Sequence, residues 1–272
     1  MQKKTYLQQS LQNGKVIRWG MGANTQSSFQ KSLSLKVYIT PFRFYSKIDE
    51  DYKYREMVLR ALETWQKASG GKIAFEIIQS LMNSQINIDW KRVDRQALGY
   101  CHFNTDSNNR LFSAEVQIGI SDGIIHHQYM AEDEVYHTIL HEIGHALGLG
   151  HSPYEDDIMF SPHKYGIVNL SNKDKLTLKW LYKFPFGLTP HEIGNKYGFH
   201  TDNLDEIVTK LIEKNEPSEF EKVKDSLKQP ERDLLQEQEN IADLKKYNLA
   251  LQDIRISENI RKLFINQSNN SK

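Results

Sequence analysis

The stretch HEIGHALGLGH, residues 141–151, decides the fold of this chain. Histidines four residues apart on a helix project from the same face, one turn above the other. His141 and His145 can therefore present their imidazole nitrogens to one metal ion at about 2.0–2.1 Å each. Glu142 is offset around the helix, where its carboxylate can reach a metal-bound water instead of the metal.

The residues after this helix complete the pattern. Gly148 can adopt left-handed backbone angles at little cost, so it can end the helix and bring His151 back as a third ligand. Three nitrogen ligands and one open position describe a catalytic zinc site. Met159 follows eight residues later and fits the Met-turn that completes the metzincin signature. His137, one turn before the first ligand, is interpreted as a neighbour of the set.

The ligand motif resembles the matrixin branch of the metzincins, the zinc endopeptidases that include the matrix metalloproteinases. Ser161 stands where astacins and serralysins have a tyrosine that can bind the metal, which favours the matrixin branch. Matrixins usually have an acidic residue where this chain has Gly150. The resemblance implies an α+β, zincin-like catalytic domain over residues 33–183. Its mixed, twisted sheet has about five strands with an antiparallel edge strand, and three helices accompany it.

The spacing of apolar residues predicts the elements of that domain. Alternation typical of half-buried strands falls at residues 33–39, 73–77, 86–90 and 116–120. Helical spacing predicts helices at about 51–69 and 131–148, and Ser171-x-x-Asp174 marks the start of a third.

The edge strand is expected at Leu98–Phe103. In matrixins this strand forms the upper rim of the cleft and pairs with an extended substrate through main-chain hydrogen bonds, as an unpaired strand edge can. Pro162 and Tyr165 resemble the wall of the pocket beside the scissile bond, although two residues separate them where the family has one. The rim residues with an implied substrate role are Gly99, Tyr100 and Cys101.

One zinc ion is predicted, and no second one. Animal matrixins hold a structural zinc in a loop that is too short here, between Trp90 and Leu98, and on strand positions that here are Tyr100 and Gln117. The sequence is silent on calcium. Cys101 is interpreted as a small half-buried residue, because the inhibitory cysteine of matrixin propeptides precedes the whole domain.

The segments on either side of the catalytic domain are different in character. Residues 1–32 are polar and are expected to form a loosely ordered lead-in, with Val16–Trp19 as a possible docking strand. Residues 184–272 are expected to form a helical, highly charged extension. Thr189 with Pro190 predicts a helix through Lys196, and a second helix is expected at about 203–214. A partial heptad pattern over 218–264 suggests either a helical hairpin or a helical partner.

Composition narrows the classes of partner. The 272 residues contain 35 Lys+Arg and 35 Asp+Glu, so no net field favours nucleic acid or an anionic membrane. No apolar run is long enough for a membrane span. The start of the chain has no apolar stretch typical of a secretory signal. The protein is expected outside the cell if a leader is missing, and in the cytoplasm otherwise.

The sequence thus predicts a zinc-dependent endopeptidase that hydrolyses extended polypeptides, with Glu142 as general base on a zinc-bound water. The alternative is a catalytically silent binding module that keeps the fold and acts through the cleft or the helical tail. In a third interpretation, residues 1–32 occupy the cleft and hold a peptidase inactive.

Overall fold

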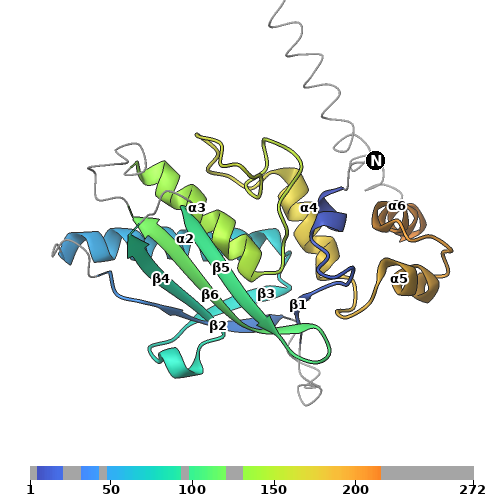
Figure 1. Cartoon of the computed structure of the whole chain (residues 1–272), viewed down its shortest axis with the longest axis horizontal. Coiled ribbons are helices and arrows are strands. Elements are labelled where there is room, and N and C mark those ends of the chain that lie inside the picture. The colour runs from blue at the N-terminus through green and yellow to red at the C-terminus, as the bar shows by residue number, and fades with distance from the viewer. Residues whose placement is uncertain (1–4, 21–31, 43–47, 93–97, 121–130, 216–272) are drawn as a thin grey trace, which may run out of the picture. The chain divides into compact units, whose positions relative to one another are not determined.

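The computed structural model describes residues 5–20, 32–42, 48–92, 98–120 and 131–215 (Figure 1). The chain divides into two compact units, residues 1–216 and 217–272. The second unit lies outside the described residues, and with it the predicted helical segment at 218–264. No helix in the described part of the chain combines the length and apolar character that a membrane span requires.

In the described residues of the first unit, six strands form a mixed sheet in the order β1-β6-β4-β2-β3, with β5 paired to β6. Strands β2, β3, β4 and β6 run parallel, and β5 is antiparallel to β6. All five predicted strands are present, and the antiparallel edge strand is the expected one. The bounds are β1 Arg18–Trp19, β2 Leu33–Ile39, β3 Ile73–Ile77, β4 Ile86–Arg92, β5 Gly99–Thr105 and β6 Arg110–Ile120.

The alternation that predicts the strands also decides which side chains are buried. Leu35, Val37 and Ile39 of β2 are buried while the residues between them are partly or fully exposed. In β6 the alternation stops near the end, because Ile118, Gly119 and Ile120 are all buried. The sheet is therefore covered most completely at the end of β6, near the helix that carries the ligand motif.

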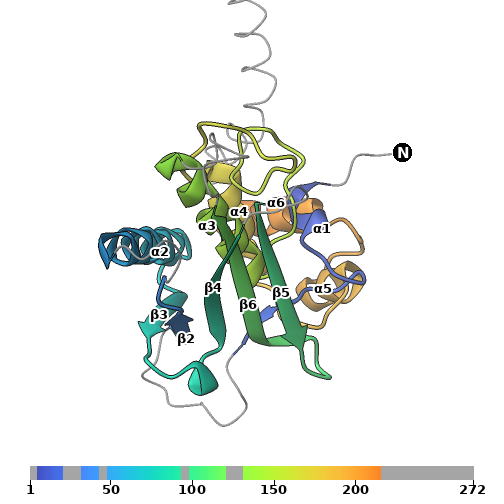
Figure 2. The ribbon, with the colours of Figure 1, turned by 60° about the vertical axis from the view of Figure 1, so that its left-hand side comes forward.

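Two long helices cover the sheet, α2 (Ile48–Ala68) and α3 (Glu132–Ala146), and they also pack on each other (Figures 1 and 2). Helix α2 contacts β3, and α3 contacts β5 and β6. Trp65 of α2 donates its indole N–H to the carbonyl of Leu140 in α3 at 3.0 Å. The predicted apolar stripe of α3 is buried throughout; its members are Val135, Ile139, Ile143 and Leu147.

Three further helices follow the ligand motif. Helix α4 (Asn172–Leu181) begins at Ser171 and α5 (Pro190–Tyr197) at Thr189, each with a complete capping box. Helix α6 (Leu204–Asn215) then ends the described part of the chain. The three starts lie within a residue or so of those predicted from sequence.

Residues 5–20 differ from the expected loose lead-in. They form the short helix α1 (Tyr6–Gln9) and the strand β1, which pairs with the first residues of β6 and so confirms the docking strand. Helix α1 contacts α4 and α6. The segment is ordered because its few apolar side chains find buried positions; these are Tyr6, Leu7, Val16, Ile17 and Trp19. The domain boundaries at 32 and 183 stay predictions.

Candidate metal centre

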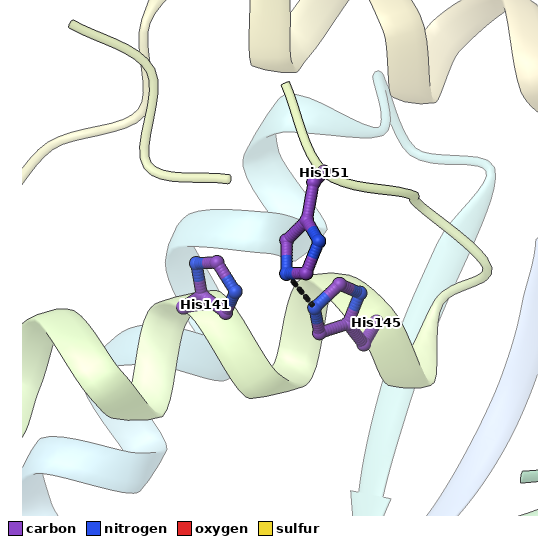
Figure 3. Close-up of side chains that lie close together, drawn as sticks. All are labelled: His141, His145 and His151. Carbon is purple, nitrogen blue, oxygen red and sulfur yellow. Dashed lines mark hydrogen bonds between the residues drawn. The ribbon is translucent and has the colours of Figure 1, made fainter. Parts of the chain in front are cut away.

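Three imidazoles meet above the last turns of α3 (Figure 3). One ring nitrogen each of His141, His145 and His151 lies within 4.8 Å of the other two. The ring centroids of His141 and His145 are 4.8 Å apart, and that of His151 lies 5.3 Å and 4.8 Å from them. The three predicted ligands thus come together, two from one face of α3 and the third from the chain that follows it.

The donor set fits a zinc ion. The Nδ1 atoms of His141 and His145 lie 2.8 Å from the carbonyl oxygens of Ile158 and Leu149. Such contacts hold the proton on Nδ1 and leave the Nε2 lone pair for a metal. The Nε2 atoms of His145 and His151 are 3.2 Å apart, drawn as a hydrogen bond in Figure 3. Two nitrogens on one tetrahedral zinc at 2.0–2.1 Å would be separated by about 3.3 Å.

Burial keeps these imidazoles in the form that binds metal. Burial, together with neighbouring His145, lowers the pKa of His141 well below its ordinary value. Burial lowers the pKa of His145 to about 4, against the opposing effect of the Leu149 carbonyl. The ring of His151 is exposed on one side, and partial desolvation on the other lowers its pKa as well. All three rings are therefore neutral near pH 7, as metal ligands must be.

Glu142 is buried beside this set, between α3 and β5. Burial raises the pKa of its carboxyl to about 8, against the opposing charge of Lys91. Strand β5 comes so close that a Cβ at Gly99 would lie 2.7 Å from Glu142 Oε1 and from Thr138 Cγ2. Burial, with a contribution from Glu142, raises the pKa of the nearby Cys101 thiol, so this cysteine is a neutral thiol. Because Gly99 has no side chain, the Glu142 carboxylate can occupy the space beside it.

The turn after α3 brings the third histidine to the other two. Gly148 has φ +96°, a backbone conformation that residues with a side chain rarely adopt. Its N–H donates to the carbonyl of His145 at 2.8 Å, and the N–H of Leu149 donates to that of Gly144 at 3.1 Å. These bonds end the helix and reverse the chain, so that His151 lies over α3 as the sequence predicts.

Met159 packs against Gly144, the residue before His145 in α3. It is fully buried, and its sulfur lies 2.3 Å from where a Cβ at Gly144 would stand. The Met159 carbonyl accepts the N–H of Ser152 at 2.7 Å, which ties the start of the following loop to its end. The buried Asp174 of α4 accepts the N–H of Ile158 at 2.9 Å. The Met-turn therefore supports the carbonyl that orients His141.

An open cleft of about 530 Å³ runs past the three histidines and Glu142. Of the predicted substrate residues, Gly99, Tyr100 and Cys101 line it from β5, and Pro162 lines it from the loop that follows Met159. Tyr165 is not among the lining residues and is 54% exposed, packed edge-on against the ring of a neighbouring histidine. The sequence predicts Tyr165 in the wall of the pocket, but it lies outside the lining of this cleft. The extra residue between Pro162 and Tyr165 goes together with this difference.

Two further histidines line the cleft. His137 is buried, with Nδ1 2.6 Å from the carbonyl oxygen of Ile167, and its ring centroid lies 4.0 Å from that of His163. His163 Nε2 is hydrogen-bonded to the buried carboxylate of Glu134. The sequence interpretation of His137 as a neighbour agrees with this position. His163 was missed because 29 residues separate it from its partner and no short motif contains both.

Within the described residues, His141, His145 and His151 form the one group of three or more histidine, cysteine or carboxylate side chains close enough to share an ion. The predicted lack of a second zinc concerns the loop after Trp90, of which residues 93–97 lie outside the described part of the chain. That expectation stays a prediction.

Comparison with known proteins agrees with the geometry of the site. A search of curated proteins finds no match for the chain. The family model described as matrixin, of the M10 peptidases, matches residues 31–183, which is more than half of the 272 residues. The matched range contains the whole sheet except β1, the helices α2 to α4, and every predicted ligand. The chain belongs to the matrixin family.

Proposed function

We propose that this protein is a zinc-dependent endopeptidase in which His141, His145 and His151 hold the ion and Glu142 is the general base. The family is one of zinc metallopeptidases in general. One observation carries the finer proposal. Three imidazoles converge in an open cleft, and the buried carboxylate of Glu142 lines the same cleft.

A zinc ion bound there would act as a Lewis acid on the scissile carbonyl and on a water molecule. Glu142 takes the proton of the attacking water and later passes it to the leaving amine. Burial raises the pKa of this carboxyl to about 8, against the opposing charge of Lys91. A nearby cation favours the carboxylate form and lowers that pKa.

The substrate is an extended polypeptide. Strand β5 pairs on one side with β6, and its residues Gly99, Tyr100, Cys101 and Phe103 face the cleft. A strand edge beside a cleft supplies main-chain donors and acceptors to any peptide in extended conformation, whatever its side chains. This geometry supports cleavage within chains, because nothing in such pairing requires a free terminus.

The test is cleavage of a generic quenched peptide by the full chain, with matched measurements of bound zinc. Chelation should abolish cleavage and added zinc should restore it. The variant Glu142→Gln should lower kcat/KM by about 10²–10⁴-fold, the usual contribution of a general base, and still bind one zinc ion. Retained zinc shows that the loss comes from proton transfer and not from an empty site.

The alternative function, a silent binding module, predicts a different result. The wild-type chain would bind zinc and the peptide but cleave nothing, and Glu142→Gln would bind the peptide equally well. A wild-type chain that binds no zinc would contradict both functions.

A further inference from the structure

The segment of residues 5–20, named here the N-terminal strap, contacts the turn that carries the third histidine. The N–H of Gly150 donates to Ser10 Oγ at 3.0 Å, and the same hydroxyl donates to the carbonyl of Tyr6 at 3.1 Å. Ser10 is 1% exposed. A Cβ at Gly150 would lie 2.3 Å from the carbonyl oxygen of Gln9. The backbone of the strap therefore occupies the place where other residues would have a side chain.

The strap also contacts the chain between the end of α3 and Gly150, at Ala146 and at Gly148. Trp19 donates its indole N–H to the carbonyl of Ala146 at 2.8 Å, at the end of α3 where helical carbonyls lack intrahelical partners. A Cβ at Gly148 would lie 2.5 Å from the carbonyl oxygen of Ile17. The course of the chain from the end of α3 to Gly150 is thus set by residues about 130–140 positions earlier in the sequence.

His151 itself is exposed, and hydrogen bonds of its neighbours hold it on both sides. Before it, the N–H of Gly150 is bonded to the strap; after it, the N–H of Ser152 is bonded to the Met159 carbonyl at 2.7 Å. Removing the first bond would leave the peptide before Gly150 held only from the side of α3, through the Leu149 carbonyl that lies 2.8 Å from His145 Nδ1. The Nε2 of His151 must reach the same point as the two rigid helix ligands, so a loose backbone there costs metal affinity.

We propose that the N-terminal strap is a positioning element of the metal centre, in which Ser10 and the Gln9 backbone hold Gly150 and so direct His151 towards the ion. This inference rests on the proposed function. It explains why glycine stands at position 150, where the sequence departs from the matrixin pattern. Among the described residues, those lining the cleft include none from the strap, so the strap supports the site from outside.

The test compares two serines of equal burial in the full chain. Ser10→Ala removes the hydroxyl that accepts the Gly150 N–H. Ser69→Ala is the matched control, because Ser69 is also 1% exposed, accepts the N–H of Ile73 at 3.1 Å and donates to the Gln66 carbonyl at 2.7 Å. Each variant loses one bond accepted from a backbone N–H and one donated to a backbone carbonyl, and Ser69→Ala also loses a 3.4 Å contact with the Ile73 carbonyl. Ser69, however, follows the end of α2 and has no contact with the turn at Gly150 among its hydrogen bonds.

Two measurements, zinc affinity and hydrogen exchange, distinguish a role of Ser10 in positioning His151 from a role in the stability of the whole domain. Zinc affinity, measured by chelator competition, should fall about 10-fold in Ser10→Ala, at the low end of the range for groups that orient ligands, and stay unchanged in Ser69→Ala. Hydrogen exchange of the metal-free chain should speed up over residues 149–152 in Ser10→Ala only. Gly150→Ala, whose Cβ displaces the strap, should lower zinc affinity further, by about 100-fold.

Equal zinc affinities and equal exchange in the two serine variants would overturn the inference. So would a rise in cleavage by Ser10→Ala, since it would mean that the strap inhibits the site. If the wild-type chain bound no zinc, the proposed function would fail, while the exchange comparison would still decide whether the strap holds the turn.

Discussion

The cleft contains two sets of histidines that are held in different ways. In the first set, His141 and His145 bond backbone carbonyls through Nδ1, and the Nε2 atoms of His145 and His151 are 3.2 Å apart. In the second, His163 bonds the buried carboxylate of Glu134 through Nε2 and packs edge-on against His137. The first set presents free nitrogens to one point, whereas a carboxylate occupies the Nε2 of His163 in the second.

The pKa values of His145 and His137 do not distinguish the set to which each residue belongs. Burial lowers the pKa of His145 to about 4, and burial together with neighbouring His163 lowers that of His137 to about 4 as well. What distinguishes a ligand here is the direction of its free nitrogen, which the backbone decides through the carbonyl bonded to the other nitrogen. A strongly shifted pKa marks a buried histidine, and only geometry shows whether it can bind an ion.

The largest expected effect comes from a substitution in the first set, and the matching substitution in the second set is its control. His145→Ala should abolish stoichiometric zinc binding and reduce cleavage to background, because two nitrogens remain for the ion. His163→Ala should keep one zinc ion per chain and change kcat/KM within about 10-fold, as expected of a group that lines the pocket but does not bind the ion. Metal analysis and peptide cleavage measure both effects. Loss of zinc in His163→Ala would break the distinction between the two sets.

The two buried glutamates of α3 extend the same contrast, because Glu134 is paired with a histidine while Glu142 lies against Gly99 of β5. Gly99→Ala places a Cβ 2.7 Å from Glu142 Oε1, so the carboxylate must move. Misplacing a catalytic group by about 1 Å should lower kcat/KM by about 10²-fold.

Bound zinc serves as the internal control for Gly99→Ala. The substitution should leave zinc content unchanged, since the atoms nearest to the added Cβ belong to Glu142 and Thr138 and not to the three histidines. Unchanged kcat/KM would show that Glu142 does not need its observed position for catalysis.

The smallest effect concerns pH. Zinc and protons compete for the ligand nitrogens, and burial holds all three ligand pKa values below 6.5. Zinc affinity should therefore stay level as the pH falls from about 7.5 to 6.5, and decline only at lower pH as the imidazoles take up protons. Chelator competition in the Glu142→Gln background measures this without titration of the glutamate. A decline that begins above pH 7 would show that the imidazoles are not held neutral by burial.

Local chemistry made much of this protein predictable from its sequence. Helical spacing places His141 and His145 on one face, Gly148 turns the chain, and Ser171 and Thr189 begin helices because their side chains cap exposed N–H groups. Each of these effects acts over at most about ten residues. The five predicted strands follow from alternation over similarly short segments.

Contacts between distant parts of the chain were not predictable in this way. The Glu134–His163 pair joins residues 29 positions apart, and the Gly150–Ser10 bond joins residues 140 positions apart. The polar composition of residues 1–32 suggested a loose lead-in, but a handful of apolar side chains was enough to fold residues 5–20 against the domain.

The sequence by itself therefore determined which residues could bind a metal ion, the order of strands and helices, and the family. Only the tertiary structure decided that Glu142 fills the space left by Gly99, that a paired histidine and glutamate line the cleft, and that the N-terminal strap lies behind His151. The physical reason is that spacing along a helix or strand is set by covalent geometry, whereas close packing between remote segments depends on how the whole chain buries its apolar surface.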